Sequence, residues 1–79
     1  METKQDLLEI LNELHPDIDF EAETALIDDK LLDSFDVVTL VTEIGSAFDV
    51  ELTAADMTSE NFNSLDAMIE MVEEKLQEL

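Results

Sequence analysis

The chain has 79 residues and a formal net charge of −19, because 22 Asp and Glu residues stand against three Lys and no Arg. Phosphate backbones and anionic lipids attract proteins through Lys and Arg, so this composition argues against nucleic-acid and membrane-surface roles. Hydrophobic residues nevertheless make up 46% of the chain, more than a disordered acidic tail carries. We therefore expect a single folded acidic domain over residues 1–79, whose core is only just large enough to stabilise the fold.

Cysteine is absent, so neither a disulfide nor a zinc–thiolate site can hold the chain together. No apolar run is long enough to cross a bilayer, and the first residues, METKQDLLEI, lack the basic start and apolar middle of a signal peptide. These features predict a cytoplasmic protein that does not insert into membranes.

Three segments repeat apolar residues at helical spacing, and one Gly and one Pro are too few for the turns of an all-β domain. The three apolar stripes are Leu7, Ile10, Leu11 and Leu14; Val37, Leu40, Val41, Ile44 and Phe48; and Leu65, Met68, Ile69, Val72, Leu76 and Leu79. The first helix should end at His15-Pro16, because the residue before a proline is pushed out of helical geometry. We predict Asp33 as the cap of the middle helix, and Asn63 or Ser64 as the cap of the last.

Residues 15–33 form a long connection that is too polar and too irregular in period for another long helix. Loops of this length are uncommon unless they are functional, and apolar side chains along this one can attach it to the helices. These side chains are Ile18, Phe20, Leu26, Ile27, Leu31 and Leu32. A short extra helical turn is expected within residues 49–62. The predicted fold is thus an all-α bundle of three main helices and one short helix, with a long ordered loop between the first two.

The side chains that enzymes use for catalysis are scarce, since the chain has one His and no Cys, Arg or Tyr. His15 lies at the predicted end of the first helix, where a positive charge is favourable near the terminal carbonyl groups. This structural role explains His15 without any catalytic one. Carboxylates are abundant, but no pair is set apart for acid–base chemistry. We therefore expect no catalytic site in this chain.

The carboxylates of the first loop allow a test for calcium binding. Asp17, Asp19 and Glu21 stand at the first three ligand positions of an EF-hand loop. Ala22, however, replaces the Gly of its sharp turn, and Asp28 replaces the bidentate Glu at its last position. We expect weak, non-specific binding of divalent ions and no dedicated metal site.

The head of the middle helix carries the most informative pattern, Leu31-Leu32-Asp33-Ser34-Phe35-Asp36. A structural explanation exists for its acids. Asp33 as the N-cap with Asp36 at the third helical position resembles a capping box, and acids in a first turn complement the helix dipole. That explanation needs no function for Ser34.

Two apolar residues at this helix start are not explained by the core. At about 100° per residue, Phe35 and Val38 lie off the buried stripe, with Thr42 between them in angle one turn further along. Ser34 stands at a helix terminus whose backbone N–H groups favour a phosphate. A phosphate ester on Ser34 and a partner protein docked on Phe35 and Val38 would use both features. The alternative is that the long loop covers these two side chains.

At these residues the chain resembles the acyl carrier proteins. Their hallmark is Asp-Ser-Leu, or Asp-Ser-Met/Phe in variants, at the start of the second helix, and Asp33-Ser34-Phe35 matches it. The continuation VVTLVTEIGSAFDVEL, residues 37–52, is similar to the family's second helix and the turn after it. The resemblance extends over nearly the whole chain and implies an acyl-carrier-like fold and a carrier without a catalytic site of its own.

The resemblance also implies a covalent cofactor, 4′-phosphopantetheine. A phosphopantetheinyl transferase would use coenzyme A and Mg²⁺ to attach this arm to Ser34, and its thiol would hold an acyl or aminoacyl group as a thioester. Asp33 would help the transferase to hold its metal. The residues facing partner enzymes would be Phe35, Val38, Thr42 and Asp36. Loading and accepting enzymes with basic docking patches would be steered to the −19 surface of this carrier, which we expect to be a monomer.

Two departures from the fatty-acid carriers bear on the cargo. Residues 30–32 stand directly before Asp33-Ser34, where those carriers usually place a Gly. The exposed side of the second helix has few acids, Asp36 and Glu43. The Leu-Leu-Asp-Ser-Phe approach and residues 60–64 resemble the stand-alone carriers of D-alanylation or peptide-synthetase-like systems. Fatty acid biosynthesis and D-alanyl transfer for cell-envelope modification stay open as pathways. An unmodified acidic interaction module and a calcium-buffering protein are the alternatives from other classes.

Overall fold

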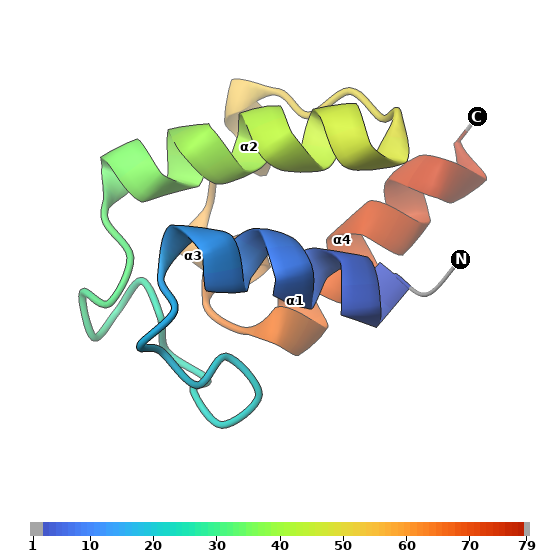
Figure 1. The fold of residues 1–79 in the computed structure, drawn as a ribbon. Coiled ribbons are helices and arrows are strands. Elements are labelled where there is room, and N and C mark those ends of the chain that lie inside the picture. Colours follow the sequence, from blue (N-terminus) through green and yellow to red (C-terminus); the bar gives the residue numbers. More distant parts are fainter. Residues whose placement is uncertain (1–2, 79) are drawn as a thin grey trace.

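The computed structural model describes residues 3–78, which form an all-helical bundle with no strand among them. Its helices are α1 (Thr3–Leu14), α2 (Ser34–Phe48), α3 (Ser59–Phe62) and α4 (Leu65–Gln77), with a 3₁₀ turn, η1 (Ala54–Asp56), ahead of α3. In Figure 1, α1 and α2 lie side by side and run in opposite directions, and α4 crosses behind α1. The prediction of an acyl-carrier-like bundle of three main helices and a short one is confirmed. None of the helices in the described part of the chain has the length and apolar character of a membrane span.

The helix starts follow the predicted caps. Asp33 Oδ1 accepts the N–H of Asp36 at 2.9 Å, and Asp36 Oδ2 accepts the N–H of Asp33 at 3.2 Å. This capping box satisfies two N–H groups that a helix start would otherwise leave without a partner. Of the two candidates for the last helix, Ser64 is the cap, since its Oγ accepts the N–H of Ala67 at 3.1 Å.

The core combines the apolar faces of the long helices with side chains from the loops and α3. Its buried residues are Leu7, Leu11, Phe20, Leu26, Leu32, Leu40, Ile44, Phe48, Val50, Phe62, Leu65, Met68, Met71 and Val72. The predicted stripes lie in this core or pack against it, apart from Leu79, which lies outside the described residues. Met71 is buried although the predicted stripe omits it, because α4 contacts α1, α2 and α3 and so buries a wider face.

The long loop between α1 and α2 is ordered, as predicted, and both apolar and polar contacts hold it. Three of its side chains, Phe20, Leu26 and Leu32, are buried in the core. Asn63, which follows α3, binds the loop through its side chain: Oδ1 accepts the N–H of Ile27 at 2.9 Å and that of Asp28 at 3.1 Å. The backbone carbonyl of Asn63 also accepts the N–H of Leu26 at 2.8 Å. The segment that leads into α2 is thereby fixed against the connection between α3 and α4.

Lys30 adopts a left-handed backbone conformation in this loop, with φ 61°. For an ordinary L-residue this conformation costs about 1–2 kcal/mol, whereas Gly adopts it readily. We expect Lys30→Gly to raise the free energy of unfolding by about 0.5–1 kcal/mol in urea denaturation. Lys30→Ala removes the same charge and keeps the Cβ, so it is the matched control. Equal stability of the Gly and Ala variants would contradict the prediction.

Candidate functional site

Ser34 is the first residue of α2 and is exposed to solvent. The capping box fixes the backbone on both sides of it, because Asp33 and Asp36 bind each other across Ser34 and Phe35. A group attached to a side chain at this position lies at the positive end of the helix dipole, where a phosphate is favoured. The structure therefore presents the predicted attachment residue on a fixed and accessible helix start.

A groove of about 440 Å³ opens beside Ser34. Its apolar walls come from Ile27, Leu32, Val37, Val38 and Met57. Polar groups are contributed by Asp33, Ser34, Thr58 and Ser59. The groove thus joins the first loop, the start of α2 and the segment that leads into α3. Concave sites with apolar walls and a few polar groups are typical of ligand binding.

The exposed face of α2 carries the predicted docking residues. Phe35 is 76% exposed and Val38 is 51% exposed, so the explanation that the long loop covers these side chains is wrong. Thr42 is also exposed on this face, and its hydroxyl donates to the backbone carbonyl of Val38 at 3.1 Å. Met57, whose exposure the sequence does not reveal, is 37% exposed and lines the same groove as Val38. Large apolar side chains exposed together indicate an interaction surface.

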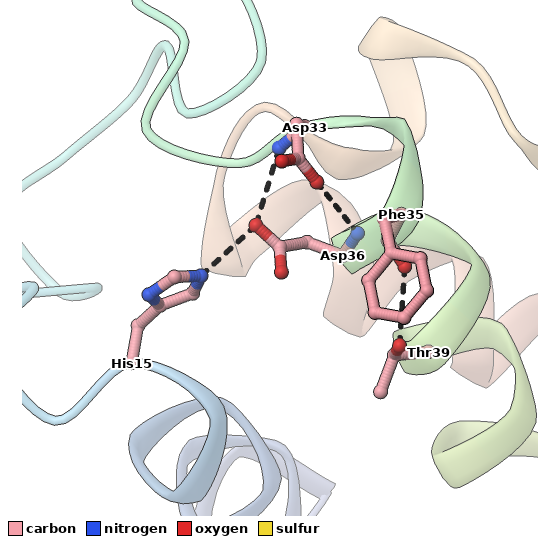
Figure 2. Close-up of polar contacts among 5 residues, drawn as sticks. All are labelled: His15, Asp33, Phe35, Asp36 and Thr39. Carbon is pink, nitrogen blue, oxygen red and sulfur yellow. Dashed lines mark hydrogen bonds and ion pairs between the residues drawn. The ribbon is translucent and has the colours of Figure 1, made fainter.

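His15 connects the end of α1 to the start of α2. Its Nε2 lies 2.9 Å from Asp36 Oδ2, the oxygen that also accepts the N–H of Asp33. Both contacts are drawn as dashed lines in Figure 2. Phe35 points away from this network. Burial raises the pKa of Asp36, but the hydrogen bonds from His15 and from the Asp33 backbone outweigh it and hold the pKa below 3.8, its ordinary value. Asp36 is therefore ionised at neutral pH.

The two predicted acids at the site differ in their surroundings. Asp33 is exposed and lines the groove, as a contact with a bound transferase would require. The side chain of Asp36 is only 14% exposed, and its Oδ2 accepts two hydrogen bonds within the chain. The capping bond of Asp36 was predicted from the sequence and its contact with His15 was not, while its contact with partner enzymes stays a prediction.

Two of the acids that match the EF-hand pattern, Asp19 and Glu21, take part in contacts within the chain. Asp19 Oδ1 accepts the N–H of Glu21 at 3.3 Å, and the carboxylate of Glu21 lies 3.1 Å from Lys4 Nζ. Within residues 3–78, no group of three or more acidic or histidine side chains is arranged so that it could hold a metal ion.

Comparison with known proteins finds relatives that match nearly the whole chain. D-alanyl carrier proteins from three strains of Streptococcus thermophilus are each 29% identical over 75 residues, which span 94% of this chain and 95% of the relatives. The resemblance to the carrier family is confirmed. No model of a protein family matches this carrier-like chain. No solved structure matches it either.

The charge of this carrier-like chain leads to a prediction about its stability. Self-repulsion among 22 acids destabilises the compact state, and salt screens it. We expect about 0.1 M NaCl, or millimolar MgCl₂, to stabilise the chain by about 1 kcal/mol, which raises the melting temperature by about 4–8 °C at this size. Circular dichroism measures the melting temperature in low-salt buffer before and after addition of each salt, and sucrose serves as an uncharged control. A melting temperature that does not change with salt would contradict the prediction.

Proposed function

We propose that the chain is an acyl carrier protein that holds an acyl or aminoacyl group as a thioester on 4′-phosphopantetheine attached to Ser34. The observation that carries this proposal is the placement of Ser34, which is exposed at the start of α2, beside an apolar groove and an exposed apolar face. The relatives named as D-alanyl carrier proteins match along nearly their full length and support a carrier role. When bound, the arm supplies the thiol that forms the thioester.

The attachment reaction takes coenzyme A as its second substrate and a phosphopantetheinyl transferase as its catalyst. Ser34 Oγ forms a bond to the phosphate that carries the pantetheine arm, while the diphosphate linkage of coenzyme A breaks and adenosine 3′,5′-bisphosphate leaves. The hydroxyl proton passes to a base of the transferase. Asp33 Oδ1 already accepts the N–H of Asp36, so we assign the contact with the transferase's Mg²⁺ to Asp33 Oδ2.

The groove beside Ser34 fits a pantetheine arm. The arm alternates methylene groups with amides, and the groove combines apolar walls with the polar residues Thr58 and Ser59. Because Ser34 itself lines the groove, an arm attached to it would start beside these walls. This arrangement would shield part of the arm from water between deliveries.

The exposed face of α2 is the proposed docking surface for the partner enzymes. Phe35 and Val38 offer apolar anchors on a chain whose net charge is −19. Partners that combine an apolar pocket with a rim of Lys and Arg would bind quickly by electrostatic steering. Such contacts suit a shuttle protein, which must dissociate after each delivery.

Among the possible cargoes we favour D-alanine, because all three relatives carry the name D-alanyl carrier protein. After attachment of the arm, we expect a D-alanine-adenylating enzyme with ATP to add one D-alanyl group, which intact mass spectrometry detects. Loading of a fatty acyl group alone, by an acyl-transferring enzyme under the same conditions, would move the proposal to fatty acid biosynthesis.

The proposed function is tested by incubating the purified chain with coenzyme A, Mg²⁺ and a broad-specificity phosphopantetheinyl transferase. We expect a gain in intact mass that corresponds to one phosphopantetheine group. An unmodified acidic interaction module gains nothing in this experiment, so an unchanged mass would favour that alternative over the carrier function.

A further inference from the structure

Two capping boxes in this chain are each bound by a basic side chain from a distant element. In the box that starts α2, Asp36 Oδ2 lies 2.9 Å from His15 Nε2. In the box that starts η1, Asp56 Oδ2 lies 3.1 Å from Lys75 Nζ in α4. The two acids occupy the same third position in their boxes, and their side chains are only 14% and 17% exposed. In both cases a local turn is bound to another helix through one carboxylate.

The His15 contact connects α1 to the turn that carries Ser34. The backbone N–H of His15 donates to the carbonyl of Leu11 at 2.9 Å, so His15 continues the last turn of α1. Its side chain is 30% exposed and reaches the one oxygen of Asp36 that also accepts the N–H of Asp33. Ser34 and Phe35 lie between the two acids. The shared oxygen therefore closes the capping box around them and also holds this turn in place relative to α1.

We propose that His15 is a positioning residue for the modification of Ser34: through Asp36, it holds the Asp33–Asp36 turn in the orientation in which a transferase can reach Ser34 Oγ. This inference rests on the proposed function at Ser34. His15 touches none of the reacting atoms. When protonated, its ring makes a charge-assisted hydrogen bond to Asp36 and offsets part of the negative charge of the two acids at this turn.

Positioning and docking have different kinetic signatures. Docking to the transferase depends on the exposed apolar side chains of Phe35 and Val38, which His15→Ala retains, whereas the reach of Ser34 Oγ depends on the orientation of the turn. A misplacement of about 1 Å can cost up to about 100-fold in rate. We expect His15→Ala to lower kcat for phosphopantetheine attachment about tenfold and to change KM for the chain less than about twofold. His15→Gln retains an N–H donor of similar reach and should recover most of kcat.

Lys75→Met is the matched control. It breaks the corresponding ion pair at η1, keeps most of the methylene stem and leaves the start of α2 unchanged, so we expect wild-type kcat and KM. Urea denaturation establishes that each variant is folded at the assay temperature. In NMR spectra, the amide signals of Ser34 and Phe35 should shift in His15→Ala and stay in place in Lys75→Met.

Three outcomes overturn the inference. A wild-type kcat in His15→Ala, or an equal loss of kcat in Lys75→Met, overturns it. A loss that appears in KM alone also overturns it, because docking would then be the affected step. If His15→Ala does not fold, His15→Asn, whose side chain is too short to reach Asp36, replaces it with the same expected loss of kcat. A wild-type chain that takes no phosphopantetheine overturns the proposed function itself, whatever the variants do.

Discussion

Ser34→Ala is expected to stay unmodified under conditions in which transferase and coenzyme A convert the wild-type chain completely. The substitution removes the hydroxyl oxygen that would form the bond to phosphate and leaves the rest of the helix start intact. Because Ser34 is exposed, we expect its loss to change the free energy of unfolding by less than about 0.5 kcal/mol. Intact mass spectrometry measures the modification, and urea denaturation measures the stability.

Two other serines provide controls for the Ser34 experiment. Ser46 is exposed on the same helix, and Ser59 lines the same groove, so their alanine variants test whether any accessible hydroxyl in this region suffices. We expect Ser46→Ala and Ser59→Ala to gain the full mass of one phosphopantetheine group. A gain of that mass by Ser34→Ala would show that another hydroxyl is the acceptor and would contradict the proposed site.

Local rules were sufficient to predict the helices and the start of α2. The capping box depends only on residue types three positions apart, Asp33 and Asp36, and on the dipole that they complement. The placement of Phe35 and Val38 off the buried stripe followed from their angle on the helix, whereas the structure was needed to show that the long loop does not cover them. Each of these features involves residues within a few turns of one another, so the sequence contains enough information to place them.

Contacts between distant segments could not be predicted in this way. His15 and Asp36 are 21 positions apart, and Asn63 binds Ile27 across 36 positions, so both contacts depend on the path of the long loop. Gly45 is another example. A Cβ at this position would lie 3.2 Å from the carbonyl oxygen of Val50, because the chain turns back directly after α2. The side-chain pattern of α2 does not reveal this close approach.

The largest effect on stability is expected from Phe62→Ala. Phe62 is fully buried in the short helix α3, and α3 packs against α4. Replacing a buried Phe with Ala costs about 3–5 kcal/mol, while a chain of this size has a total stability of about 4–12 kcal/mol. Urea denaturation should therefore show a drop of about 3–5 kcal/mol in the free energy of unfolding, which leaves the chain partly unfolded in water if its stability is at the low end of this range. A loss of less than about 1 kcal/mol would mean that α3 is not part of the cooperative core.

Phe35→Ala removes the same side chain from the opposite environment and should separate binding from folding. With 76% of Phe35 exposed, the variant should unfold within about 0.5 kcal/mol of the wild type. An apolar anchor at the centre of an interface is worth about 1–2 kcal/mol, so KM for the transferase should rise about tenfold while kcat changes little. Val38→Ala, which removes a smaller side chain from the same face, should raise KM less.

If Phe35→Ala destabilises the chain as much as Phe62→Ala does, Phe35 belongs to the core and the exposed face of α2 is not a docking surface. If it folds and is modified with wild-type kinetics, the transferase binds elsewhere. A rise in KM together with intact folding is the combination that distinguishes a docking face from a core face, because the two phenylalanines differ in exposure and not in chemistry.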